Sequence, residues 1–177
     1  MDDRTPFLQG GLEWIYGEDP PERCPTCEFA WDLDFDDTLR VIRDAPGQIA
    51  GQLDGRDGMV PQPDGSWNAT AYVWHLADLA RAWAERWIQI AEEPGSELVG
   101  FDPDDLADAR NYRRLPTAPG LWSLRESVQM LLDATARLSE SAEFVHGEWG
   151  QGTVRDAMRW LAHEFHHHER DIGARAV

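Results

Sequence analysis

The chain of 177 residues has the length of one domain, and it is strongly acidic: 33 Asp and Glu stand against 16 Arg and no Lys, a formal net charge of -17. Such a chain is repelled by nucleic-acid phosphates and anionic lipid surfaces, and its apolar runs are far shorter than the roughly 20 residues that span a bilayer. Hydrophobic residues at 42% are too many for a disordered chain. Composition therefore predicts a folded, cytoplasmic protein that binds neither nucleic acid nor membranes.

The N-terminal segment differs in composition from the rest of the chain. Residues 1–32 contain several glycines and prolines among scattered aromatic residues, and this mixture interrupts any helical period. The aromatic residues are Phe7, Trp14, Tyr16, Phe29 and Trp31. We expect an extended arm over 1–32, whose aromatic side chains pack on a domain formed by residues 33–177.

The arm carries both cysteines of the chain, Cys24 and Cys27, in the sequence CPTC. A CxxC motif can be half of a four-ligand zinc site or a redox pair, but no second CxxC and no βαβ context accompany this one. A metal would have to recruit His146 or a carboxylate such as Glu28 or Asp32. We favour a surface turn with two reduced thiols, and a structural metal site and redox chemistry are the alternatives.

Four segments repeat apolar residues at three- and four-residue steps, which is typical of amphipathic helices. The predicted long helices cover about 36–53, 69–92, 121–141 and the segment from 153 onward. Asp36 or Asp37 is the expected N-cap of the first helix, and Asn68 or Ser66 that of the second. Pro46 is expected to disturb the middle of the first helix.

The segments between these helices predict how they are connected. Residues 54–65 hold several glycines and prolines and are expected to form a loop, whereas 103–112 is typical of a short acidic helix and 116–120 of a break. About 28 residues separate the second and third long helices, enough for a long crossover connection. Because no segment shows the alternation typical of strands, we predict an all-α four-helix bundle.

Five of the six histidines fall on two of the predicted helices. His75 lies on the second helix, and the last helix carries His163, His166, His167 and His168 in the sequence WLAHEFHHHERDI. Helical bundles build metal sites from side chains of facing helices, and one helix supplies a pair at i and i+4. The two helices are therefore candidates for a shared metal site.

The apolar stripe of the last helix indicates which pair points inward. The stripe comprises Val154, Met158, Leu161, Phe165 and Ile172. At about 100° per residue, His168 lies about 40° and Glu164 about 80° from this stripe, whereas His163 and His167 lie about 140–180° away. The helical wheel thus favours Glu164 and His168 as inward ligands, and it predicts that His163 and His167 face solvent or support the ligands from outside.

A second ligand set stays open at this stage. If the bulk of Trp160 rotates the last helix, His163 and His167 turn inward and the set becomes His75, His163 and His167. The three consecutive histidines leave the register of the pair undecided by one residue.

Two stretches resemble a known family. One is the stretch from Trp67 to His75, and the other is the last helix, where Glu164 and His168 are followed by Asp171 and Ile172. Together they are similar to the DinB-like metalloenzyme superfamily. The Glu-His pair with its Asp resembles the mycothiol-dependent maleylpyruvate isomerase branch of that superfamily. The CPxC arm is similar to actinobacterial members, so the resemblance covers about residues 24–175. It implies a bundle that holds a divalent metal ion through His75, Glu164 and His168.

The resemblance also implies a chemistry. Three protein ligands leave an open coordination position, as catalytic sites do, for zinc or for nickel, iron or manganese. Relatives use a low-molecular-weight thiol, mycothiol or bacillithiol, to transfer or isomerise a small-molecule substrate. Arg159, Arg170 or Arg175 are candidates to hold a substrate carboxylate, with a solvated helix flank as the alternative.

Two further expectations concern activity and assembly. The functional hypothesis is a thiol-dependent transferase or isomerase that acts on a small electrophile, and the alternative is a non-catalytic metal-binding bundle that binds a ligand or partner. Nine Trp in 177 residues make an exposed aromatic surface, and with it a homodimer, plausible.

Overall fold

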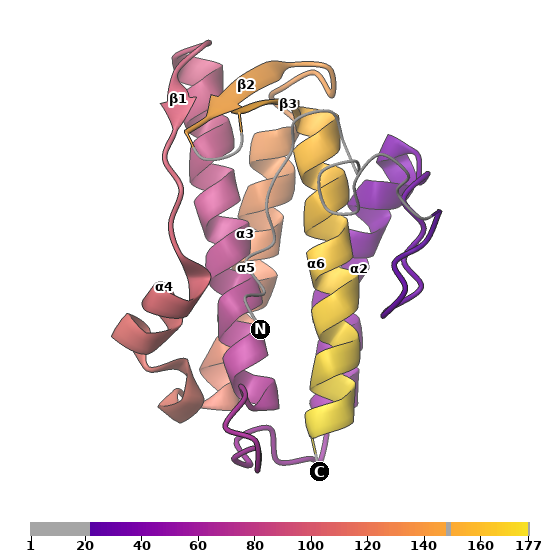
Figure 1. Ribbon diagram of the computed structural model, residues 1–177, viewed down its shortest axis with the longest axis vertical. Coiled ribbons are helices and arrows are strands. Elements are labelled where there is room, and N and C mark those ends of the chain that lie inside the picture. The colour runs from indigo at the N-terminus through magenta and orange to yellow at the C-terminus, as the bar shows by residue number, and fades with distance from the viewer. Residues whose placement is uncertain (1–21, 148–149, 177) are drawn as a thin grey trace.

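Four long helices dominate the computed structural model, which describes residues 22–147 and 150–176 (Figure 1). The helices are α2 (Phe35–Leu53), α3 (Ala69–Glu92), α5 (Thr117–Thr135) and α6 (Val154–Arg175). They form one bundle in which α3 packs most extensively on α5, and α2 on α6. The predicted all-α bundle is confirmed. Residues 1–21 of the predicted arm, with three of its aromatics, lie outside the described residues.

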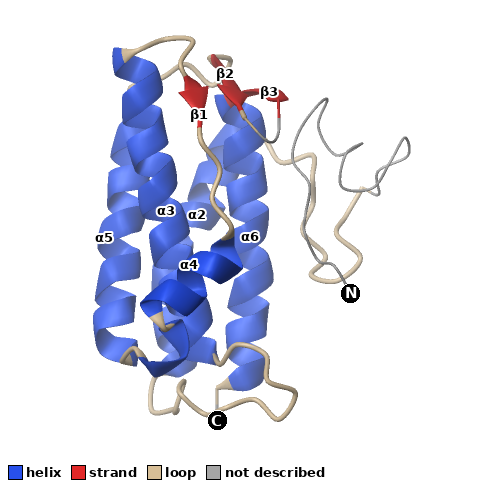
Figure 2. Ribbon diagram, turned by 60° about the vertical axis from the view of Figure 1, so that its left-hand side comes forward, coloured by secondary structure: helices blue, strands red, loops and turns tan. Residues whose placement is uncertain are grey.

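A long crossover connects α3 to α5, as the sequence predicted. It contains strand β1 (Glu97–Leu98), helix α4 (Pro103–Arg110) and the 3₁₀ helix η1 (Tyr112–Arg114). Figure 2 shows α4 lying across the outside of α3, near the end of the bundle opposite the strands. Among the described residues, no helix is both long and apolar enough to cross a membrane.

Side-chain caps define where three of the long helices begin. Asn68 accepts a hydrogen bond from the backbone N–H of Ala71, and Thr153 forms a capping box with Asp156 at the start of α6. The cap of α2 is Asp34 instead of the predicted Asp36 or Asp37. This helix also continues through Pro46, because burial of Ile42, Ala45 and Ile49 on the neighbouring turns offsets the hydrogen bond that proline cannot make.

The third long helix differs from its predicted bounds. α5 starts at Thr117, inside the expected break, and ends at Thr135, before the expected Ser141. Pro119 falls in the first turn, where the N–H that proline lacks would have no helical partner. Gly120 is needed for packing, since a Cβ there would come within 2.9 Å of Nε1 of Trp74. Both residues that suggested a break are therefore compatible with a helix start.

A small three-stranded sheet closes one end of the bundle, where the sequence predicted no strands (Figure 1). β1 pairs in parallel with β2 (Glu143–His146), and β2 pairs antiparallel with β3 (Gly150–Thr153). Strands of two to four residues are too short to show alternation in sequence. Phe144 of β2 lies against Trp83 and Trp87 of α3, with ring centroids 5.9 and 5.5 Å apart, so the sheet is packed on the core.

A buried carboxylate fastens the crossover to α3. Asp78 is 2% exposed and accepts hydrogen bonds from Arg81, Arg110 and the hydroxyl of Tyr112. Burial, together with the neighbouring Asp78, raises the pKa of Tyr112, so its hydroxyl keeps the proton that it donates. One carboxylate therefore joins α3, α4 and η1.

We expect Asp78→Ala to lower the free energy of unfolding by about 2–3 kcal/mol, because it leaves two arginines and a buried hydroxyl without their acceptor. The arginines are partly exposed, which keeps the loss below that of a fully buried ion pair. Urea unfolding followed by circular dichroism measures the change. The control Asp44→Ala on the exposed side of α2 should change stability by less than about 0.5 kcal/mol. Equal effects of the two variants would contradict the assigned role.

Candidate functional site

Three side chains from two helices converge inside the bundle. His75 extends from α3, and Glu164 and His168 extend from successive turns of α6. One potential ligand atom from each lies within 4.8 Å of those of the other two. His75 is buried, whereas the side chains of Glu164 and His168 are 16% and 17% exposed. The group is thus mostly enclosed but reaches the protein surface on the α6 side.

Asp171 determines the orientation of the His168 ring. Nδ1 of His168 lies 3.0 Å from Oδ2 of Asp171, and its Nε2 lies 3.4 Å from Oε2 of Glu164. The Asp171 carboxylate also accepts a hydrogen bond from Arg175 at 3.1 Å. Since a carboxylate can only accept, Nδ1 of His168 carries a proton and Nε2 faces the centre of the group.

Burial and charge set the protonation of the three side chains. Burial, together with nearby His168, lowers the pKa of His75 to about 3, which leaves this imidazole neutral near pH 7. Burial opposes ionisation of Glu164, but the neighbouring imidazoles of His163 and His168, each with a ring nitrogen 3.4 Å from this carboxylate, outweigh it and lower the pKa of this carboxyl. Burial also disfavours the charged form of His168, yet Asp171 and Glu164 raise its pKa to about 9. The metal-free group therefore holds a neutral imidazole beside an imidazolium-carboxylate pair.

Aromatic rings and one arginine surround these side chains. Trp67 lies 5.2 Å from the ring of His75, and Tyr72 lies 4.9 Å from the ring of His168. The guanidinium of Arg175 lies over the Tyr72 ring at 5.1 Å. Burial and the charge of Asp171 raise the pKa of Tyr72, so it remains a neutral donor. Sequence patterns did not single out Tyr72, because its partners come from a helix about 100 residues away.

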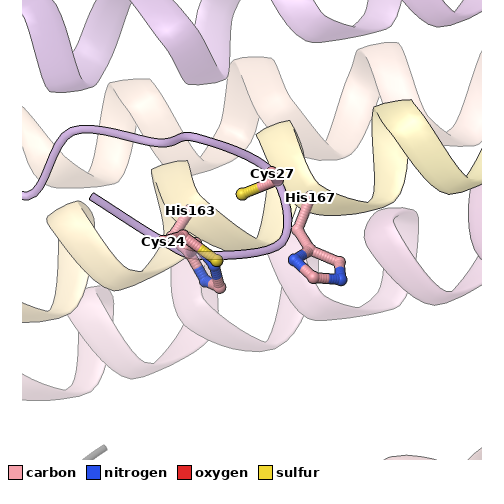
Figure 3. Close-up of side chains that lie close together, drawn as sticks. All are labelled: Cys24, Cys27, His163 and His167. Atoms are coloured by element: carbon pink, nitrogen blue, oxygen red, sulfur yellow. The ribbon is translucent and has the colours of Figure 1, made fainter. Parts of the chain in front are cut away.

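His163 and His167 do not join the three converging side chains. His163 is buried instead of facing solvent, and its Nδ1 lies 3.4 Å from Glu164, so it supports that side chain from outside; the side chain of His167 stays 26% exposed. The turn of the N-terminal arm that carries Cys24 and Cys27 lies beside both histidines (Figure 3). The ring of Trp31 lies 4.5 Å from that of His163, which is only 8% exposed. The alternative set of His75 with His163 and His167 is not brought together. The helical wheel failed here because it describes contacts with the bundle and not with a segment that crosses the outside of α6.

The cysteines are the partners of this second histidine pair. The CPTC segment is a turn with Pro25 and Thr26 exposed and both thiols reduced, as the sequence favoured, but the cysteines themselves are buried, at 4% and 6% exposed. One ligand atom each from the two cysteines, His163 and His167 lies within 4.8 Å of the others. The sequence contained a signal for this group, since CxxC and HxxxH are both common spacings of zinc ligands.

The residues expected to assist the cysteines lie elsewhere. His146 is buried in β2, and Glu28 and Asp32 are exposed. Of the candidate arginines, Arg159 donates to the backbone carbonyl of Leu33 and Arg170 is exposed. Arg175 is therefore the remaining candidate to hold a substrate carboxylate beside His75, Glu164 and His168.

Comparison with known proteins identifies the family and the fold. A profile of the DinB superfamily matches residues 17–172. YfiT from Bacillus subtilis, described as a probable metal-dependent hydrolase with an unusual four-helix bundle topology, has a similar structure with a TM-score of 0.68. The two sequences are 17% identical, and the alignment covers 89% of this chain and 92% of YfiT. No curated protein sequence matches the chain. Because the profile match extends over most of its length, the chain belongs to the DinB superfamily.

Proposed function

We propose that the protein is a divalent-metal-dependent enzyme in which His75, Glu164 and His168 hold the ion, and that it transfers or isomerises a small electrophile with the help of a low-molecular-weight thiol. The observation that carries the proposal is the convergence of these three side chains, with Asp171 turning Nε2 of His168 toward the other two. Zinc is the favoured ion, and nickel, iron and manganese accept the same donors.

The donor set fits a divalent ion. Two imidazoles and one carboxylate are ligands of catalytic zinc sites, in which three protein ligands leave at least one position open. Near neutral pH His75 is neutral and Glu164 is ionised, as metal ligands must be, and only His168 has to lose a proton. A bound divalent ion would supply Lewis acidity that lowers the pKa of a water or a thiol.

The surrounding residues have separate roles in this proposal. Asp171 holds His168 in one tautomer, and the same carboxylate anchors Arg175. Arg175 places a positive charge over Tyr72, where it would attract the carboxylate of a substrate. Tyr72, which lies beside Arg175, offers a neutral hydroxyl to the same substrate. Trp67 shields His75 from water on the α3 side.

Support for a thiol comes from the arrangement of the last helix. Glu164, His168 and the Asp171 that follows match the pattern of the mycothiol-dependent maleylpyruvate isomerase branch. The fold similarity to YfiT supports a second candidate nucleophile, water, because YfiT is described as a probable hydrolase. The same centre would serve either nucleophile, so the two are separated by experiment. A non-catalytic bundle that only holds a metal is the remaining outcome.

The first prediction concerns the ligands. His75→Ala, Glu164→Ala and His168→Ala should each remove most of the metal bound at this site, whereas Asp171→Asn should weaken binding by about tenfold to a hundredfold because it only releases the ring of His168. Elemental analysis and zinc titration measure binding. The variants are made in protein with Cys24→Ser and Cys27→Ser, so that protein thiols do not bind the added ion.

Glu169→Gln is the matched control. Glu169 follows His168 directly but hydrogen-bonds to Gln52 of α2, at 3.0 Å. Full binding in the Glu169 variant and loss in the ligand variants are expected. Retention of metal by the Glu164 and His168 variants would overturn the proposed ligand set.

The second prediction follows from the protonation of His168. The metal-free protein holds a proton on this residue below a pKa of about 9, and the metal must displace it. The apparent metal affinity should therefore rise with pH, by roughly tenfold per unit below that value, and binding near neutral pH should release about one proton. Calorimetry in buffers of different ionisation enthalpy counts the protons. A binding enthalpy that does not depend on the buffer would contradict the prediction.

The third prediction tests the thiol. Cobalt-substituted protein, again with Cys24 and Cys27 replaced by Ser, should develop a sulfur-to-cobalt charge-transfer band on addition of mycothiol, bacillithiol or a simple thiol. The band should appear with an apparent pKa well below the ~8.5 of a free thiol, because the cation favours the thiolate.

His75→Ala protein should show no such band. If no thiol produces it up to pH ~9, where a free thiol is largely ionised, the thiol proposal is abandoned. Metal-dependent hydrolysis of ester or amide substrates would then favour water as the nucleophile. Absence of both activities would favour the non-catalytic bundle.

A further inference from the structure

The CPTC segment forms a tight turn that presents both thiols to α6. The backbone N–H of Cys24 donates to the carbonyl of Phe29, and the N–H of Glu28 donates to the carbonyl of Cys24, both at 2.9 Å. Glu28 adopts a left-handed conformation with φ of 62°, and Arg23 pairs with Ala30 in a β-bridge. Figure 3 shows the two sulfur atoms on the inner side of this turn, close to the side chains of His163 and His167. No disulfide joins the cysteines.

The histidines that face the thiols have ring nitrogens without a well-formed hydrogen bond, although Nδ1 of His163 lies 3.4 Å from Oε1 of Glu164. Both ring nitrogens of His163 and Nδ1 of His167 are buried atoms. Within the described residues, none of them has a partner at hydrogen-bond distance and angle. Such buried polar atoms are costly unless something binds them. His163 and His167 are four residues apart, so both project from the same side of α6. The observation points to a ligand that the protein atoms do not themselves provide.

Neighbouring contacts hold the turn in place and bury its thiols. Phe29 and Trp31 both lie against the ring of His163, with centroids 5.6 and 4.5 Å away. His166 makes a 2.9 Å hydrogen bond with the carbonyl of Cys27. At the far end of the segment, Arg159 of α6 donates to the carbonyl of Leu33. The segment is thus fixed at both ends to α6, and aromatic rings cover His163, whereas the side chain of His167 stays 26% exposed.

We propose that Cys24, Cys27, His163 and His167 form a second metal site, a closed zinc site that fastens the N-terminal arm to α6. Two sulfur and two nitrogen donors are a typical set for tetrahedral structural zinc, and the spacings CxxC and HxxxH suit it. The ligand atoms of a tetrahedral zinc lie about 3.3–3.8 Å apart, so atoms already within 4.8 Å of one another need to shift by only roughly an ångström.

Charge and coordination distinguish this site from the one proposed for catalysis. Zinc binds two thiolates and two neutral imidazoles, so the protons that this group holds on its thiols and histidines are released to solvent, and the two thiolates balance the double charge of zinc. Four protein ligands leave no position for a substrate, which is typical of a structural site. The two sites share no ligand, although Oε1 of Glu164 lies 3.4 Å from Nδ1 of His163. That contact engages Nδ1 of His163, so in this proposal Nε2 is the nitrogen that would bind zinc.

The test counts zinc at this site alone. Protein with His75→Ala and His168→Ala lacks two ligands of the catalytic proposal, and after chelation and reduction it is titrated with zinc. We expect it to bind about one equivalent, and zinc should protect both thiols from a chromogenic disulfide reagent. Adding Cys24→Ser and Cys27→Ser should abolish binding. The Asp32→Asn control, on the same arm but exposed, should retain it.

A second measurement guards against loss of folding. Circular dichroism verifies that each variant keeps its helices. Limited proteolysis tests the arm, because zinc should slow cleavage within residues 22–34 in the protein with both cysteines. Zinc should not slow this cleavage in the variant with Cys24→Ser and Cys27→Ser. Cobalt in place of zinc should give the intense visible absorption of a tetrahedral ion together with a thiolate charge-transfer band.

Three outcomes would overturn the proposal. In the first, the protein with His75→Ala and His168→Ala does not bind zinc. In the second, zinc binding survives the loss of both cysteines. In the third, the two thiols form a stable disulfide in air and zinc does not protect them from oxidation. The last would favour the redox interpretation of CPTC. Because the catalytic site is disabled in this protein, none of these outcomes depends on whether that site binds metal or is active.

Discussion

The helical period of α6 is the constraint on which both candidate centres depend. Residues four positions apart lie about 40° apart around a helix, and adjacent residues lie about 100° apart. Glu164 and His168 therefore share the face toward α3, whereas His163 and His167 share the next face, toward the N-terminal arm. One helix thus presents two ligand pairs in different directions, and each pair is completed by a different segment of the chain.

The partners of the two pairs then give them different chemistry. The pair that meets His75 is partly exposed, is oriented by Asp171 and has three donors, which suits an ion that must also contact a substrate. The other pair forms a group of four donors with the two cysteines, and Phe29 and Trp31 pack on its His163, which suits an ion that only holds chain segments together. Glu164, which lies between them, contacts a histidine on each side, so the charge of this one carboxylate stabilises both centres.

The order of the helices and the inward ligand pair could be predicted from the sequence because they depend on local patterns. Apolar residues at three- and four-residue steps gave α3 its bounds at Ala69 and Glu92, and the stripe on α6 pointed to Glu164 and His168. Features that depend on packing were missed. Pro119 and Gly120 suggested a break but belong to the first turn of α5, and the strands are too short for any alternation to be visible.

The sequence by itself determined which residues share a helix face, the acidic composition and the CxxC spacing, because each is set by the order of neighbouring residues. Only the tertiary structure decided what each face meets. His163 and His167 lie opposite the apolar stripe of α6 and would face solvent on an isolated bundle. His163 is buried and His167 is half-buried because an arm about 135 residues earlier in the chain crosses the helix at this point. A helical wheel contains no information about such a contact, since that contact depends on how distant segments pack and not on the period of one helix.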